Sequence, residues 1–227
     1  MDLTAELVEL VDRLEPDPGP EPGTTDHTDV ELAEMAHRIL AQHDPKDFWV
    51  FAYGSLIWNP EFESVEHSRA VAHGWHRAFC LQITRWRGTR ELPGLMMALD
   101  RGGSCAGVAY RLPPHDNHGH VLRLLEREID AKPPTNIPRW IKVRTPGRDI
   151  LALAFVAKQD GRAYAGKRSL PEVAANLASA AGHWGTMASY AFQTIARLED
   201  HGIHDRNLWQ LQKMVAAEIR AKTGVKG

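Results

Sequence analysis

The order of strand-like and helical stretches is the feature that most constrains the fold of this chain. Strand-like stretches are concentrated between residues 48 and 157, and three helical stretches follow at 170–181, 185–201 and 206–222. Strands that come first and helices that come last favour the α+β class. Because antiparallel strands of this number can close on themselves, we expect a small β-barrel with helices around it.

The strand-like part begins with FWVFAYGSL, an apolar run at residues 48–56 that ends at a Gly-Ser turn. A helix from about Asp116 to Asp130 interrupts the strands. Gly182 and Gly202 separate the final helices, and we interpret Gly182–Gly185 as a helix–helix turn. The other strand-like stretches are 69–86, 94–100, 104–112, 137–145 and 150–157.

The first 45 residues differ in character from the rest. Leucines at helical spacing predict a short amphipathic helix over 3–14, and residues 15–23 hold four prolines, which is typical of a stiff extended linker. A second helix is expected from Asp29, as its N-cap, to about Gln42. We therefore divide the chain into an N-terminal arm, residues 1–45, and a main domain, residues 46–227.

Charge and cysteine usage exclude several classes of protein. The net charge is −2, although residues 1–30 hold nine acidic residues and one base, so binding of nucleic acid through bulk charge is not expected. No apolar run approaches the roughly 18 residues of a membrane span. The start is too acidic for a secretory or transit signal. Cys80 and Cys105 lack CxxC spacing, so we expect a cytoplasmic protein without a disulfide framework or zinc module.

Glu128 is the strongest candidate for chemistry. In HVLRLLEREID, residues 120–130, the apolar side chains form one helical stripe; Glu128 falls about 50° from its centre and Glu126 about 110°. A carboxylate at an apolar boundary is costly unless it is paired or protonated, and its pKa tends to rise. Such a group suits general acid–base catalysis near neutral pH. The alternative is a structural ion pair with Arg127 or Arg85.

The turn Tyr53-Gly54-Ser55-Leu56 is a candidate binding element. Gly54 permits a positive φ angle and a close approach of a ligand to the backbone. Successive N–H groups at a strand end can hold an anion or an oxyanion. The alternative is an ordinary strand-terminating turn. Ser55 is not favoured as a nucleophile, because the GxSxG motif is absent.

Three further segments carry weaker signals. The loop Arg85–Arg90 either binds a substrate carboxylate, with Arg87 as the candidate, or is a solvated hairpin loop. The HxxHxH pattern at residues 115–120 has no Cys or acidic residue at a firm metal-ligand spacing, so metal binding is not favoured. Tyr190, on the helix predicted at 185–201, is either a core residue or a pocket hydroxyl.

Taken together, several segments resemble the ChaC-type γ-glutamylcyclotransferases, and most closely their bacterial branch. They are FAYGSLIWNPEF, GWHRAFCL, RGTRELPGLMMALDRGG, GVAYRLP and a helix with LEREI, and they follow one another in the family's order over about residues 48–200. The segment GHWGTMASYAF also resembles the family's Gly-rich turn and the tyrosine that follows it.

The resemblance implies a small mixed β-barrel with surrounding helices that removes the γ-glutamyl group of glutathione as 5-oxoproline and releases Cys-Gly. It implies no metal or organic cofactor. Glu128 matches the catalytic glutamate of the family's Arg-Glu pair, Tyr53 to Leu56 match the substrate-binding turn, and Tyr190 matches a tyrosine near the substrate. Arg87 is our added candidate for a substrate carboxylate. The expected partner is glutathione, with no nucleic acid or membrane, and the chain is expected to be a monomer or weak dimer.

One segment departs from the family pattern. Many relatives place a Gly-Tyr pair soon after the glutamate, where this chain has Ile129–Pro134. Two alternatives therefore stay open: a cyclotransferase for another γ-glutamyl amino acid or amine, and a non-catalytic module that binds a γ-glutamyl metabolite. The presence of Glu128 favours an enzyme. No function is assigned to the arm, residues 1–45.

Overall fold

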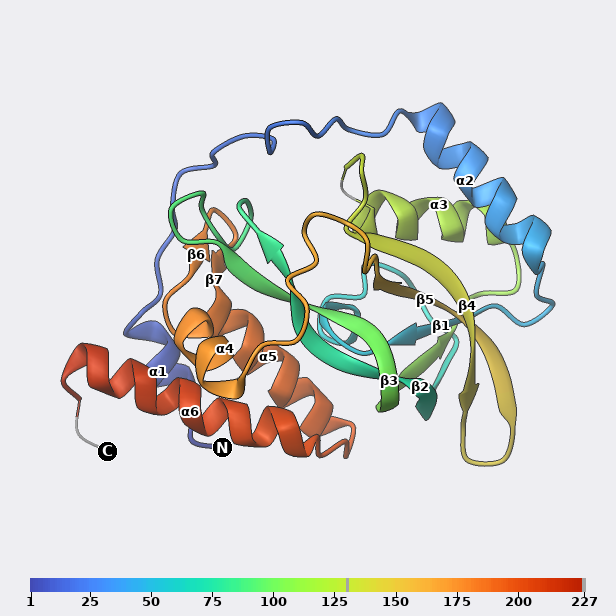
Figure 1. Ribbon diagram of the computed structural model, residues 1–227. Coiled ribbons are helices and arrows are strands. Elements are labelled where there is room, and N and C mark those ends of the chain that lie inside the picture. Colours follow the sequence, from blue (N-terminus) through green and yellow to red (C-terminus); the bar gives the residue numbers. More distant parts are fainter. Residues whose placement is uncertain (130, 226–227) are drawn as a thin grey trace. The chain divides into compact units, whose positions relative to one another are not determined.

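The computed structural model describes residues 1–129 and 131–225, and its helices and strands are drawn in Figure 1. The chain divides into two compact units. The barrel unit comprises Gly23–Ala78 and Ala98–Tyr164. The helical unit comprises Met1–Pro22, Phe79–Met97 and Ala165–Gly227.

A closed five-stranded barrel forms the centre of the barrel unit. The strand order is β1-β3-β2-β4-β5, and β5 closes the barrel by parallel pairing with β1 and β3. Antiparallel pairing joins β1 to β3 and β4 to β5, so the small mixed barrel and the α+β class are confirmed. The strands are β1 (Trp49–Ala52), β2 (Glu66–Ile83), β3 (Gly94–Arg111), β4 (Asn136–Arg144) and β5 (Asp149–Ala157).

Strands β1 and β3 pack closely where β1 ends, just before the turn Tyr53–Leu56. All four residues of β1 are buried. A Cβ atom at Gly107 of β3 would lie 2.4 Å from the carbonyl oxygen of Ala52 and 2.7 Å from the ring of Phe51. Only glycine therefore lets the two strands approach so closely where β1 ends, which explains Gly107 in the segment GVAYRLP.

Two α-helices, α2 (Asp29–Gln42) and α3 (Asn117–Glu128), pack against each other in the barrel unit (Figure 1). The expected N-cap at Asp29 is wrong by one residue. Thr28 is the N-cap, because Glu31 stands three residues later and completes a reciprocal capping box with it. The predicted end of α3 at Asp130 lies outside the described residues.

The helical unit buries its own apolar core. Leu3, Leu177 and Ile219 come from distant parts of the sequence, and all three are fully buried. Both α1 and α4 pack against α5 and α6. The elements are α1 (Ala5–Glu9), α4 (Leu170–Leu177), β6 (Ala181–Gly182), β7 (Gly185–Thr186), α5 (Met187–Asp200) and α6 (Arg206–Thr223).

Several elements differ from their expected form, among them the helix expected over 170–181, which is the shorter α4 (Leu170–Leu177). The stretches 94–100 and 104–112 form one strand, β3, because Gly102 and Gly103 adopt positive φ and let the strand continue through a bend. The expected helix–helix turn at 182–185 is the β6–β7 hairpin, in which Gly185 has φ +97°. The helix expected over 3–14 is the shorter α1.

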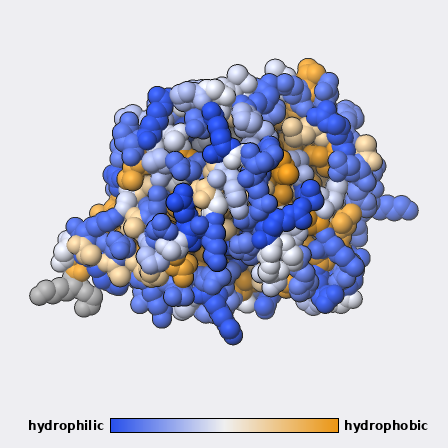
Figure 2. Space-filling view, in the orientation of Figure 1, coloured by the Kyte–Doolittle hydropathy of each residue, from blue (hydrophilic) through white to orange (hydrophobic). Residues whose placement is uncertain are grey.

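The N-terminal arm contributes to both units. Residues 1–22 belong to the helical unit, whereas residues 23–45 belong to the barrel unit. The division into an arm and a catalytic domain at residue 45 stays a prediction. Hydrophilic side chains cover much of the face shown in Figure 2, with smaller apolar areas between them.

Candidate active site

The turn after β1 is fixed to the barrel by Tyr53. Its hydroxyl donates to the carbonyl oxygen of Phe155 at 2.8 Å, and its own carbonyl oxygen accepts from Nε of Arg77 at 2.8 Å. The side chain is only 7% exposed. Arg77 also donates to the carbonyl oxygen of Ala106, so it links the turn to β3. Tyr53 therefore anchors the turn rather than presenting a free hydroxyl.

Gly54 does not adopt the positive φ angle that its residue type permits. Its φ is −141° and its ψ is −126°, and it precedes a 3₁₀ helix, η1 (Ser55–Ile57). The amides of Ser55 and Leu56 begin this helix, and amides in that position have no partner within a helix. The N–H groups of Ser55 and Leu56 at the start of η1 stay candidates for binding an oxyanion.

Glu128 is the last residue of α3. The apolar face of that helix, including Leu124 and Leu125, is buried, and Glu126 is exposed. The Glu128 side chain is only 15% exposed. The inward placement predicted from the helical wheel is therefore confirmed.

Arg127 joins Glu128 to the turn after β1. Its Nε donates to Oε1 of Glu128 at 2.9 Å, and its Nη2 donates to Oγ of Ser55 at 3.4 Å. Its Nη1 lies 2.9 Å from Oε1 of Glu61, an ion pair without the angle of a hydrogen bond. One guanidinium thus holds two carboxylates and a hydroxyl. The ion pair with Arg127, which the sequence analysis gave as the alternative for Glu128, is therefore present.

The environment of Ser55 gives no support for a serine nucleophile. Its hydroxyl accepts a hydrogen bond from Arg127. A guanidinium remains protonated at any ordinary pH and cannot take a proton from a serine hydroxyl.

Arg87 and Tyr190 lie together in the helical unit. The guanidinium carbon of Arg87 is 5.8 Å from the ring centre of Tyr190, and its Nη1 donates to the carbonyl oxygen of Thr186 at 2.9 Å. Burial lowers the pKa of Arg87 below its usual value. Tyr190 is 2% exposed and packs edge-on against Phe79, so its ring is part of the apolar core. Their substrate-binding roles stay predictions.

The other two arginines of the Arg85–Arg90 loop bind the N-terminal arm. Arg85 donates to both carboxylate oxygens of Asp17 at 2.8 and 2.7 Å, and Arg90 donates to the carbonyl oxygen of Pro18 at 3.4 Å. Arg87, the third arginine of this loop, instead donates to the carbonyl oxygen of Thr186.

Two residues of the barrel-unit network were missed by the sequence analysis. Arg77 supports the carbonyl of Tyr53, and Glu61 pairs with Arg127. Arg77 lies within GWHRAFCL, so the family resemblance contained a signal for it. Glu61 likewise lies within the family segment FAYGSLIWNPEF.

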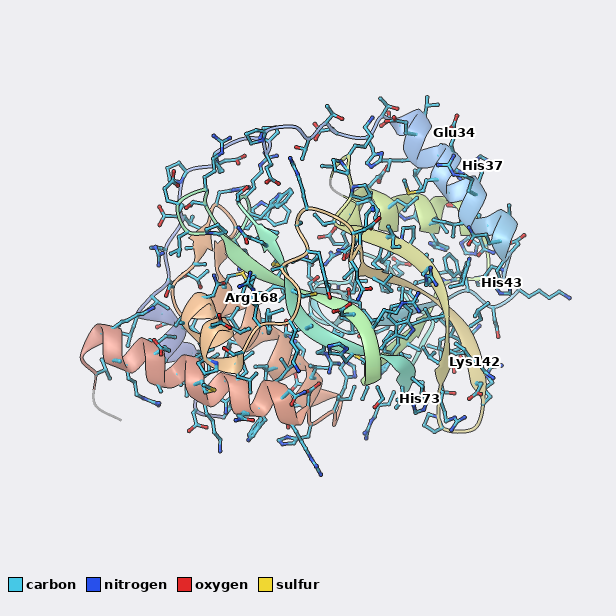
Figure 3. The ribbon with its side chains drawn as sticks, in the orientation of Figure 1. Glu34, His37, His43, His73, Lys142 and Arg168 are labelled. Atoms are coloured by element: carbon cyan, nitrogen blue, oxygen red, sulfur yellow. The ribbon has the colours of Figure 1, made fainter. Side chains whose placement is uncertain are left out.

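The histidines of the HxxHxH segment pack against neighbouring side chains and do not form a metal site within the described residues. His118 lies 4.5 Å, between ring centres, from His37 of α2, which Figure 3 labels. His120 is buried, and burial followed by the charge of Arg123 lowers its pKa. Within the described residues, no group of three His, Cys, Asp or Glu side chains is arranged to hold a metal ion.

No helix in residues 1–129 or 131–225 has both the length and the apolar character to cross a bilayer.

Comparisons with known proteins show the family to which this chain is similar. A family model described as ChaC-like protein matches residues 48–218. The glutathione-specific γ-glutamylcyclotransferase of Escherichia coli is 36% identical over 177 residues, which cover 78% of this chain and 76% of that protein. Glutathione-specific γ-glutamylcyclotransferase 1 of Mus musculus is 30% identical, covering 65% of this chain and 67% of that protein.

A solved structure supports the fold. The crystal structure of the γ-glutamylcyclotransferase specific to glutathione from yeast superposes with a TM-score of 0.68 at 20% identity, covering 76% of this chain and 96% of that one. The barrel with its helices is therefore shared with that enzyme. On the family match, which covers both the turn after β1 and Glu128, this chain belongs to the ChaC-like protein family.

Proposed function

We propose that this chain degrades glutathione by cyclising its γ-glutamyl group. The observation that carries the proposal is the partly buried carboxylate of Glu128, held by Arg127 beside the turn after β1. The similarity to glutathione-specific γ-glutamylcyclotransferases of Escherichia coli and Mus musculus supports the choice of substrate.

The reaction is an intramolecular aminolysis. The α-amine nitrogen of the γ-glutamyl group attacks its own γ-carbonyl carbon, and the new C–N bond closes a five-membered ring. The bond from the γ-carbon to the cysteine nitrogen then breaks, and 5-oxoproline and Cys-Gly are released. The α-ammonium nitrogen loses two protons as it becomes the ring N–H of 5-oxoproline, and the leaving nitrogen gains two as it becomes the ammonium group of Cys-Gly. The substrate supplies its own nucleophile, so no covalent enzyme intermediate is required.

Glu128 is the residue that moves the proton. The α-ammonium has no lone pair, so a base must deprotonate it before attack, and the same carboxyl can protonate the leaving nitrogen. A positioned acid–base group is worth about 10²–10⁴ in rate.

The turn and the basic loop bind the rest of the substrate. The amides of Ser55 and Leu56 stabilise the oxyanion on the γ-carbon, and losing one such donor costs roughly 3–4 kcal/mol in other enzymes. Arg87, with Tyr190 beside it, binds a carboxylate. Folding the γ-glutamyl chain back on itself accounts for further acceleration, of about 7 kcal/mol or more in ideal cases.

The proposal also covers cofactors, cellular compartment and oligomeric state. Ring closure needs no metal or organic cofactor. A reducing cytoplasm suits a chain whose two cysteines, Cys80 and Cys105, are both buried and form no disulfide. A monomer or weak dimer stays our expectation.

The test is a metal-free incubation of the purified chain with reduced glutathione. We expect 5-oxoproline and Cys-Gly in equal amounts by mass spectrometry. A parallel panel of γ-glutamyl amino acids and amines tests the alternative substrate, which the altered segment after Glu128 motivates. If another panel member is turned over faster than glutathione, that compound replaces glutathione as the proposed substrate. Binding without any turnover would leave only a non-catalytic module.

A further inference from the structure

Residues 23–42 reach the segment that follows Glu128. The amide of Lys132 donates to the carbonyl oxygen of Thr25 at 2.8 Å, and the amide of Thr25 donates back to the carbonyl oxygen of Lys132 at 3.1 Å. This isolated antiparallel bridge connects positions more than 100 residues apart in sequence. It holds the backbone four residues beyond Glu128.

An ion pair reinforces the bridge. Nζ of Lys132 donates to both carboxylate oxygens of Glu31 at 2.6 and 2.7 Å. The hydrogen bond from Lys132 is the largest of the effects that lower the pKa of Glu31 to about 2. The Glu31 carboxylate therefore stays ionised throughout the neutral range.

Glu31 also completes the capping box of α2. Its Oε2 accepts from the amide of Thr28 at 2.8 Å, while the Thr28 hydroxyl accepts from the amide of Glu31. The start of α2 and the segment after Glu128 consequently share one carboxylate. A glutamine can keep the capping box but cannot keep the ion pair.

The far end of α2 is attached to the body of the barrel unit. Nε1 of Trp140 on β4 donates to the carbonyl oxygen of Ile39 at 3.0 Å. Nδ2 of Asn117, the first residue of α3, donates to the carbonyl oxygen of Pro45 at 3.1 Å. Because α2 also packs along α3, it is fixed at both ends around the helix that carries Glu128.

We propose that residues 23–42 form a brace that holds the carboxyl end of α3, and that Glu31 and Lys132 are positioning residues for Glu128. The inference rests on the proposed role of Glu128 as the acid–base group. The brace gives part of the N-terminal arm a function that the sequence pattern alone did not assign.

The first test compares Glu31→Gln with Glu34→Gln, a matched control on the same helix. Glu34, labelled in Figure 3, is 64% exposed and pairs along its own helix with Arg38 at 3.6 Å. We expect Glu31→Gln to lower kcat for glutathione about threefold to fivefold, because the loss of a partly exposed ion pair can change a rate by that factor. KM should stay within twofold of the wild-type value. Lys132→Gln should match it, and Lys132→Arg should restore kcat. The control should leave kcat unchanged.

The second readout does not depend on turnover. Amide hydrogen exchange of Ile129 and Lys132, followed by NMR, should be faster in Glu31→Gln than in wild type and unchanged in Glu34→Gln. Unchanged exchange in Glu31→Gln, or faster exchange with an unchanged kcat, overturns the brace. A wild-type chain that does not turn over glutathione overturns the proposed function instead, and the exchange rates then decide whether the brace exists.

Discussion

Arg127 is the residue on which the geometry of the candidate site depends most. It donates to Glu128 and Ser55 and pairs with Glu61, and its side chain is 13% exposed. The helical wheel placed Glu128 correctly because the periodicity of one helix is local information. The contacts of Arg127 to Ser55 and Glu61 join positions more than 60 residues apart, so no local pattern contained them.

Replacing Arg127 should disable turnover. Arg127→Gln is expected to lower kcat about 100-fold or more, because Glu128 loses both the neighbouring charge and its fixed orientation. Arg127→Lys should restore little, since an ammonium cannot reproduce the guanidinium fork that reaches several partners. Steady-state kinetics checks this, with Arg123→Gln, a 51% exposed arginine on the same helix, as control. Near-normal kcat in Arg127→Gln would refute the assignment.

Replacing Arg87 should affect substrate binding more than chemistry. Arg87→Gln is expected to raise KM for glutathione about tenfold or more, the range of a hydrogen bond to a charged group, and to change kcat less. Arg90→Gln, an exposed position in the same loop, is the control. An unchanged KM in Arg87→Gln would remove Arg87 from the substrate-binding residues.

At the scale of elements, hydrophobic periodicity predicted what regular local patterns can specify. The barrel strands, α3 and the C-terminal helices occur close to their expected places. Glycines caused the main errors. Gly102 and Gly103 indicate a break between strands, but tertiary pairing carries β3 through them. The β6–β7 hairpin packs so closely on the Arg85–Arg90 loop that a Cβ at Gly182 would lie 2.2 Å from the carbonyl oxygen of Trp86.

The contact between β1 and β3 gives a stability prediction. Gly107→Ala should destabilise the fold by about 1–3 kcal/mol, because its Cβ would overlap the carbonyl oxygen of Ala52 and the ring of Phe51. Chemical denaturation measures the change. Gly161→Ala, whose nearest contact would be 3.0 Å, should cost less. Equal stability of the two variants would contradict the close approach of these strands.

At the scale of the whole molecule, the chain contributes three separate segments to the helical unit and two to the barrel unit. The arm shows why sequence alone could not assign them. The amide of Leu3 donates to Oε1 of Gln212 at 2.7 Å, while Thr25 pairs with Lys132. These contacts link positions that are more than 100 residues apart. The charge pattern of the sequence indicated that the arm is acidic, but it did not indicate which residues the arm contacts.

Attachment of the arm within the helical unit should depend on pH. The hydrogen bonds from Arg85 are the largest effect that lowers the pKa of Asp17, from 3.8 to about 2. The folded state therefore holds a proton on Asp17 less tightly than the unfolded state, so the stabilisation is present above about pH 4 and disappears as pH falls towards 2.

Thermal unfolding from pH 2 to 7 checks this dependence. Asp17→Asn should have a lower Tm than wild type at neutral pH, and the difference should vanish near pH 2. Asp26→Asn, an exposed acid, is the control. A difference in Tm that is constant over the whole range would show that this carboxylate does not link the arm to Arg85.

The most direct test of the central claim compares Glu128→Gln with Glu126→Gln, two carboxylates on one helix of which only the first is directed inward. Production of 5-oxoproline from glutathione should fall by at least 100-fold in Glu128→Gln and stay at the wild-type rate in Glu126→Gln. Calorimetry should show that both variants still bind glutathione. Retained turnover in Glu128→Gln would contradict the account, because the carboxylate would then not be the group that moves the proton.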